Sequence, residues 1–205
     1  MATIVPIDFA KARYALAAHY PSQWPQDIGA EVAFAGRSNV GKSSAINAIT
    51  NQNRLAKTSK TPGRTQQIVF FELQDSLRLV DLPGYGYAKA PANLRKHWQE
   101  FISEYLSSRQ CLCALVIPMD IRRPLTELDI IMLEHCWEIE LAVHVLLTKA
   151  DKFKRAKALN ILQAVSKDLK SQPQTTVQLF SAAKKQGVDE ARKQLTGYLH
   201  EKVPA

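Results

Sequence analysis

Residues 36–43 read GRSNVGKS and fit the phosphate-loop pattern G-x-x-x-x-G-K-S/T, after an apolar run and before a helical one. Gly36 and Gly41 let the backbone bend so that its N–H groups converge on phosphate oxygens, and a helix beginning at Lys42 adds the positive end of its dipole. We expect Lys42 to reach the terminal phosphates and the Ser43 hydroxyl to ligate magnesium. The sequence therefore predicts a nucleotide site with the β-phosphate in this loop.

The sequence DLPG at residues 81–84 follows the apolar run LRLV. D-x-x-G alone is common by chance, but Asp81 falls at the carboxyl end of a predicted strand, where a carboxylate of the magnesium shell is needed. We expect Asp81 to contact magnesium through water and the N–H of Gly84 to contact a γ-phosphate.

The sequence TKAD at residues 148–151 decides the base. An aspartate accepts two hydrogen bonds from N1–H and the exocyclic amine of guanine, and adenine offers no such pair, so Asp151 predicts GTP or GDP rather than ATP. Lys149 is expected to lie along the ring face. A backbone N–H in FSA, residues 180–182, is available for the guanine oxygen, although that tripeptide means nothing alone.

The elements that must position these residues alternate along the chain, with short apolar runs separated by helical patterns. This alternation predicts an α/β fold: a mostly parallel six-stranded sheet with helices on both faces. The runs at 66–73 and 77–81 are separated only by QDS, which is too short for a crossover, so they predict an antiparallel hairpin and one antiparallel edge strand. We expect residues 1–30 to be an N-terminal extension and residues 31–205 to be a single GTP-binding domain.

Composition bounds the remaining possibilities. The chain has 205 residues, of which 46% are hydrophobic and 22% charged, as in one soluble globular domain. The formal net charge of +8 favours a polyanionic partner such as RNA or an acidic membrane surface. Three cysteines without paired spacing, and no apolar run long enough for a secretory leader or a membrane span, predict a cytoplasmic protein.

Five motifs in order, GRSNVGKS, the Thr of PGRTQ, DLPG, TKAD and FSA, resemble those of translation-factor class P-loop GTPases. The longer strings AGRSNVGKSS, KTPGRTQ and DLPGYGYAK resemble the EngB/YihA/YsxC family of bacterial ribosome-biogenesis GTPases, from about Glu31 to the C-terminus. The resemblance implies a Ras-like fold, a magnesium-dependent GTP switch, and a role in assembling the large (50S) ribosomal subunit, and hence in growth, cell division and septation. It places the switch-I magnesium ligand at Thr65.

The motifs and the resemblance together give a predicted site. Its catalytic residues are Lys42, Thr65 and Gly84, and its metal ligands are Ser43, Thr65 and, through water, Asp81. The nucleotide-binding residues are Gly36, Arg37, Ser38, Asn39, Val40, Gly41, Lys42, Ser43, Ser44, Gly63, Arg64, Thr65, Gln66, Asp81, Leu82, Pro83, Gly84, Thr148, Lys149, Ala150, Asp151, Phe180, Ser181 and Ala182.

Hydrolysis is expected to be slow because Tyr85 stands where Ras-type enzymes place a water-positioning glutamine. One source of stimulation is a potassium ion held by Asn39, as in related GTPases with an asparagine there; the other interpretation of Asn39 is a loop-capping side chain. A second source is the ribosome, if docking orders residues 54–64 and the YGYAKAP segment around the γ-phosphate.

The expected partner is the large ribosomal subunit, through rRNA or a ribosomal protein, and we expect a monomer that binds neither membrane nor DNA. Basic residues gather at 54–64 and at 152–157; the second group is also explained as a solvated helix face. A P-loop kinase is disfavoured by Asp151. The remaining alternative is a GTP switch at the membrane or the division septum, for which the sequence offers no lipid signal or amphipathic anchor.

Overall fold

The computed structural model describes residues 7–57, 67–74, 76–85 and 92–202, with residues 92–99 described by their backbone alone. The strands are β1 (Arg13–Ala18), β2 (Ala30–Phe34), β3 (Ile68–Gln74), β4 (Leu77–Asp81), β5 (Leu112–Asp120), β6 (Ala142–Thr148) and β7 (Thr175–Leu179). The α-helices are α1 (Lys42–Ile49), α2 (Ala92–Ser108), α3 (Glu127–Glu138), α4 (Arg155–Asp168) and α5 (Val188–Lys202), with short 3-10 helices at Phe9–Lys11, Pro21–Gln23 and Ala150–Lys152.

The strands form one seven-stranded sheet in the order β1-β3-β4-β2-β5-β6-β7. The pairs β2·β4, β2·β5, β5·β6 and β6·β7 are parallel, and β3 is antiparallel to both of its neighbours. The predicted α/β class, the mostly parallel sheet and the β3–β4 hairpin are therefore confirmed.

The sheet has seven strands rather than the predicted six, and β3 lies inside it rather than at its edge. The added strand is β1, which lies within the stretch predicted to be only an extension. Its sequence RYALAA contains no β-branched residue, so local preference does not indicate a strand. The strand exists through its pairing with β3, where Arg13 lies opposite Glu72 and forms a 2.9 Å ion pair with it.

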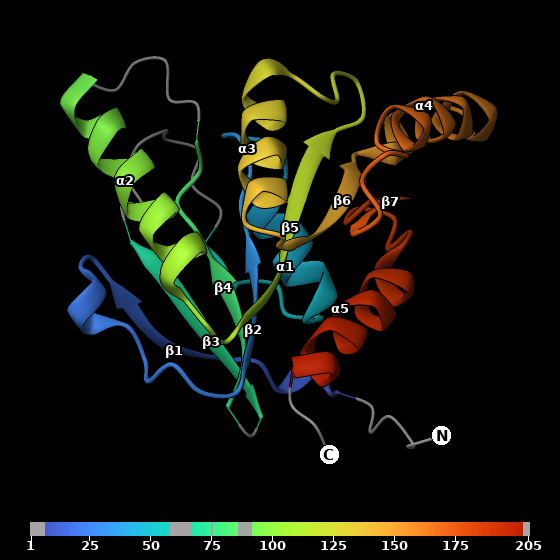
Figure 1. Cartoon of the computed structure of the whole chain (residues 1–205). Coiled ribbons are helices and arrows are strands. Elements are labelled where there is room, and N and C mark those ends of the chain that lie inside the picture. Colours follow the sequence, from blue (N-terminus) through green and yellow to red (C-terminus); the bar gives the residue numbers. More distant parts are fainter. Residues whose placement is uncertain (1–6, 58–66, 75, 86–91, 203–205) are drawn as a thin grey trace.

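Helices cover both faces of the sheet (Figure 1). Side chains of α2, α3 and α4 share one apolar core with the sheet, and those of α1 and α5 share the other. Every residue of β2 and β4 is buried, as expected for strands covered on both faces. The carboxyl ends of these two strands are therefore held rigidly. Asp81 is the last residue of β4, and Gly36 follows two residues after the end of β2.

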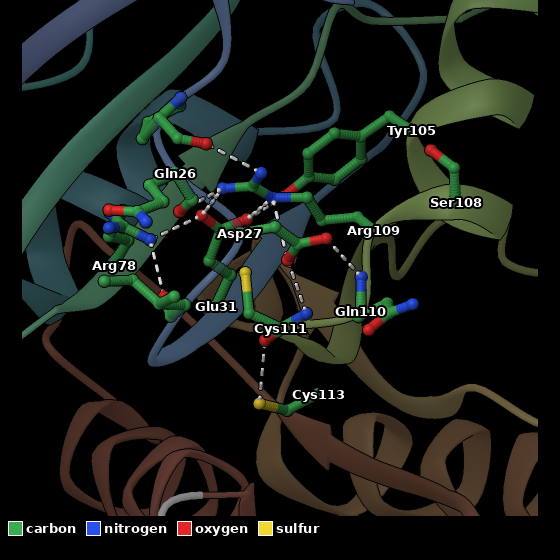
Figure 2. A network of polar contacts seen from close by, with 12 residues as sticks. Gln26, Asp27, Glu31, Arg78, Tyr105, Ser108, Arg109, Gln110, Cys111 and Cys113 are labelled. Carbon is green, nitrogen blue, oxygen red and sulfur yellow. Dashed lines mark hydrogen bonds and ion pairs between the residues drawn. The ribbon is translucent and has the colours of Figure 1, made fainter.

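A buried ionic network lies at the opposite end of β2 from the predicted site (Figure 2). Glu31 is fully buried, and its carboxylate accepts hydrogen bonds from Arg78 at 3.0 Å, from Arg109 at 2.7 and 2.9 Å, and from Tyr105 at 2.7 Å. A buried carboxylate is tolerated only when it is paired in this way. The network joins β2, β4 and the end of α2.

Cysteine and aromatic side chains away from the site pack in the apolar cores. Cys111 and Cys136 are buried and Cys113 is half-buried, as small core residues. Phe101 and Tyr105 lie in the core, whereas the side chain of Trp98 is outside the described part of the chain. No helix in the described ranges is long and apolar enough to cross a membrane.

Candidate nucleotide-binding site

The phosphate loop connects β2 to α1, and its two glycines are needed for different reasons, one for backbone conformation and one for space. Gly41 has a φ of 104°, a left-handed conformation that disfavours side chains. A Cβ added to Gly36 would lie 3.0 Å from Val40 Cγ2 and 3.3 Å from the carbonyl oxygen of Pro118. The predicted helix start at Lys42 is confirmed, so the N–H groups at the start of α1 face the loop.

The TKAD motif is fastened to this loop from the end of β6. The hydroxyl of Thr148 donates to the carbonyl oxygen of Val40 at 2.6 Å, and Lys149 donates from Nζ to the carbonyl oxygen of Asn39 at 2.8 Å. Lys149 also lies 2.9 Å from a carboxylate oxygen of Asp120. Two motifs that are more than a hundred residues apart thus form one surface.

Asp120 is a site residue that the sequence analysis missed. It ends β5, and its carboxylate accepts hydrogen bonds from Arg122 and holds Lys149. These hydrogen bonds hold the pKa of Asp120 below its usual range, and the hydrogen bond from Arg122 contributes most. Its signal in the sequence was an acidic residue at the carboxyl end of a strand, the same position that drew attention to Asp81.

The base-recognition residues meet beyond Lys149. Ser181 is fully buried, and its hydroxyl donates to Oδ1 of Asp151 at 2.5 Å. This hydrogen bond is the leading cause of a lowered pKa at Asp151, so the carboxylate stays ionised at neutral pH. The backbone N–H of Ala150 donates to the carbonyl oxygen of Phe180 at 3.1 Å, which joins the two motifs by their main chains as well.

The FSA segment uses two of its three N–H groups within the fold. That of Phe180 donates to the carbonyl oxygen of Leu147, and that of Ser181 donates to the carbonyl oxygen of Gln186. Within the described ranges no hydrogen bond occupies the N–H of Ala182. Ala182 is therefore the residue of this segment that fits the predicted contact with the guanine oxygen.

The phosphate end of the site brings together a cation and oxygen donors. The Nζ of Lys42 contacts Oδ1 of Asp81, and Ser43 lines the same cavity. A hydroxyl and a carboxylate are the hard oxygen ligands that magnesium prefers, so Ser43 and Asp81 fit the metal. To hold a phosphate, Lys42 must exchange its ion pair with Asp81 for the phosphate oxygens, which leaves Asp81 for the metal.

The cavity has a volume of about 1230 Å³. Twelve predicted site residues line it: Arg37, Ser38, Asn39, Gly41, Lys42, Ser43, Ser44, Asp81, Leu82, Pro83, Gly84 and Lys149. Five further predicted residues are buried and do not line the cavity: Val40, Thr148, Ala150, Phe180 and Ser181. The predicted residues Gly63, Arg64, Thr65 and Gln66 lie outside the described residues, so the magnesium contact of Thr65 stays a prediction.

Comparison with known proteins agrees with this geometry. The family model described as "50S ribosome-binding GTPase" matches residues 31–149. A probable GTP-binding protein EngB of Stenotrophomonas maltophilia is 54% identical over 191 residues, which cover 92% of this chain and 96% of that protein. The EngB protein of Xanthomonas campestris strain 8004 is also 54% identical, over 92% of each chain.

The chain belongs to the EngB family of GTP-binding proteins. Solved structures agree on the fold. A probable GTP-binding protein engB has a TM-score of 0.69 at 21% identity and covers 84% of this chain and all of its own. Era, solved with MgGDPNP and nucleotides 1506–1542 of 16S rRNA, has a TM-score of 0.68 at 22% identity, over 86% of this chain and 58% of Era.

Membership of the EngB family confirms the predictions of GTP binding and GTPase class. A GTPase of this class binds GTP or GDP with magnesium, and the donor set of Lys42, Ser43 and Asp81 fits both. Magnesium, when bound, neutralises charge on the β- and γ-phosphate oxygens. The positioning of the nucleotide by Lys42 at the phosphates and by Asp151 at the base stays a prediction, with which the placement of both residues is compatible.

Proposed function

We propose that this EngB-family protein is a GTP-dependent switch that acts in assembly of the large (50S) ribosomal subunit and is thereby needed for normal growth, cell division and septation. The observation that carries the proposal is the match of residues 31–149 to a family described as 50S ribosome-binding GTPases. The net charge of +8 supports a polyanionic partner.

The surface beside the phosphate cavity is basic where it is described. Arg54 and Lys57 line the cavity and are exposed, close to the loop that holds the nucleotide. Cations at this position neutralise RNA phosphates without reading sequence. A ribosome-bound state that depends on the nucleotide therefore has a physical route, because the basic residues and the phosphate site share one cavity.

We also propose that intrinsic hydrolysis is slow and that potassium, the ribosome or both stimulate it. Tyr85 stands at the water-positioning site and directs its hydroxyl to Asp129 of α3, at 3.2 Å, so its side chain does not replace a glutamine. Asn39 lines the phosphate cavity, and this position is what supports it as the residue that holds potassium. Its left-handed conformation, φ 63°, is one that asparagine tolerates and fits the loop-capping interpretation equally.

The test is sedimentation of the full chain with separated ribosomal subunits, loaded with GDP or with a non-hydrolysable GTP analogue, at several salt concentrations. We expect pelleting with the large subunit in the GTP form only. Equal, salt-labile pelleting in both nucleotide states would contradict the proposal, because charge alone then explains the binding.

A matched pair of variants locates the surface. Arg54→Ala combined with Lys57→Ala removes two charges beside the cavity and should weaken pelleting at least tenfold. Lys154→Ala combined with Arg155→Ala removes the same charge from exposed positions at the start of α4 and should change it less than twofold.

A further inference from the structure

A fully buried carboxylate, Asp129, lies in the first turn of α3 beside the phosphate loop. Its Oδ2 accepts from the backbone N–H of Thr126 at 3.0 Å and from the Thr126 hydroxyl at 2.7 Å. The backbone contact is the half of the capping box that Asp129 supplies at the start of α3, and the hydroxyl contact holds the same oxygen. Capping therefore accounts for one carboxylate oxygen and leaves the other to be explained.

The second oxygen faces the nucleotide site. Oδ1 of Asp129 lies 3.3 Å from Nε of Arg37 and accepts the hydroxyl hydrogen bond of Tyr85 at 3.2 Å. Burial, followed by the charge of Asp129, raises the pKa of Tyr85 well above its usual value, so the phenol remains a donor. One carboxylate thus holds the second residue of the phosphate loop and the residue that follows DLPG.

The main chain shows what this contact positions. The N–H of Tyr85 donates to the carbonyl oxygen of Gly36 at 3.2 Å, and the N–H of Leu82 donates to that of Phe34 at 3.0 Å. The DLPG segment therefore runs along the start of the phosphate loop. Gly84 lies between these two hydrogen bonds, so its N–H has a place fixed by Tyr85 on one side and by β4 on the other.

We propose that Asp129 is a positioning residue of the GTP site: through Tyr85 and Arg37 it fixes the Gly84 N–H relative to the phosphate loop, and so favours GTP over GDP. The inference rests on the proposed contact between Gly84 and the γ-phosphate. A segment that is already ordered loses less conformational entropy when the γ-phosphate binds it. GDP does not use this contact and gains nothing from it.

The first test is Tyr85→Phe, which removes only the phenol oxygen and leaves Arg37 as the partner of Oδ1. Dissociation constants for GDP and for the non-hydrolysable β,γ-imido analogue of GTP are measured with magnesium by displacement of a fluorescent GDP. We expect the affinity for the analogue to fall at least fivefold, with the affinity for GDP within twofold of wild type. Asp129→Asn should act in the same direction, and the double variant should lose no more than the larger single loss.

Tyr105→Phe is the matched control, because its hydroxyl also donates to a buried carboxylate, Glu31 at 2.7 Å, but at the far end of the sheet. It should lower stability and leave the ratio of analogue to GDP affinity unchanged. The proposal is overturned if Tyr85→Phe leaves that ratio unchanged, weakens both nucleotides equally, or shifts the ratio toward the analogue. A wild-type protein that binds neither guanine nucleotide would instead overturn the proposed function, and the inference with it.

Discussion

The hydroxyl of Ser181 donates to Oδ1 of Asp151 at 2.5 Å across 30 positions of sequence. Ser181 is fully buried, and its Oγ also accepts the backbone N–H of Lys184 at 3.2 Å, so two contacts hold the hydroxyl in place. The carboxylate of Asp151 is therefore aimed before any base arrives. This arrangement predicts both which nucleotide the protein selects and how that selection fails.

Asp151→Asn should exchange guanine for xanthine. The asparagine side chain presents an N–H donor where the carboxylate presented a hydrogen-bond acceptor. It therefore cannot accept from both the N1–H and the exocyclic amine of guanine, but its N–H can donate to the carbonyl oxygen that xanthine has in place of that amine. We expect GTP affinity to fall about 100-fold and xanthosine triphosphate to become the tighter ligand, since two charge-assisted hydrogen bonds are worth about 3 kcal/mol. Competition against fluorescent GDP measures both. Asp168→Asn, at an exposed position at the end of α4, should change neither affinity.

Ser181→Ala should weaken GDP and GTP equally, by about tenfold, because Asp151 loses its hydrogen-bond donor and its orientation. Unlike Asp151→Asn, it should give no affinity for xanthine nucleotides. Isothermal titration with GDP, GTP analogue and xanthosine diphosphate separates the two variants. Unchanged guanine affinity would mean that the backbone contact of Ala150 with Phe180 is enough to aim the carboxylate.

Potassium should raise the turnover number for GTP several-fold over sodium at fixed ionic strength. A cation beside the phosphates would supply the kind of charge that an arginine finger brings in other GTPases. In Asn39→Ala the two salts should give the same rate, while GDP affinity stays within a few-fold. Equal rates in both salts for the wild-type protein would contradict the potassium proposal and leave Asn39 as a loop-capping residue.

The sequence predicted most of this site because phosphate binding needs contiguous residues of fixed type. A loop of N–H groups, the following lysine and serine, and an aspartate at a strand end are each local patterns. Asp129 was missed for the opposite reason: its role depends on partners that the fold brings to it, such as Arg37, 92 positions away. Asp120 did carry a local signal, an acidic residue at a strand end, but its role in the site depends on Lys149, which follows the next strand.

The same difference between local patterns and distant contacts separates the parts of the fold that the sequence predicted from those that it did not. Apolar runs identified the buried strands, but β1 depends on its neighbour β3 for its existence. Glu31 lies within the apolar run that predicted β2, and nothing local indicates that two arginines and a tyrosine converge on it. Pairwise contacts of large sequence separation carry no local pattern, and these are the features that the sequence could not supply.

Arg109→Ala should destabilise the protein by about 3–5 kcal/mol, because it leaves the buried charge of Glu31 with two fewer donors. Urea unfolding followed by circular dichroism measures the loss. The exposed ion pair of Arg13 with Glu72 is the comparison, since its side chains are 75% and 36% exposed. Arg13→Ala should cost at most about 1 kcal/mol. Equal losses in the two variants would contradict the view that burial makes the Glu31 network costly to break.

His144 should make the protein less stable in mild acid. It is buried, with Nδ1 2.7 Å from the hydroxyl of Thr176 and Nε2 2.9 Å from Oε1 of Gln178, and burial lowers its pKa to about 4 from an ordinary value of 6.5. The amide oxygen only accepts, so Nε2 carries the proton of the neutral ring and Nδ1 accepts from Thr176.

Between pH 6.5 and 4 the unfolded chain therefore binds a proton at His144 that the folded chain does not, and stability falls as the pH falls. The loss at His144 between pH 7.5 and 5 should be about 2 kcal/mol. Urea midpoints across this range should fall less steeply in His144→Gln than in wild type, whereas His19→Gln, at an exposed position, should keep the full slope. If the slope survives in His144→Gln, the acid sensitivity comes from carboxylates, because only groups whose pKa differs between the folded and unfolded states contribute to it.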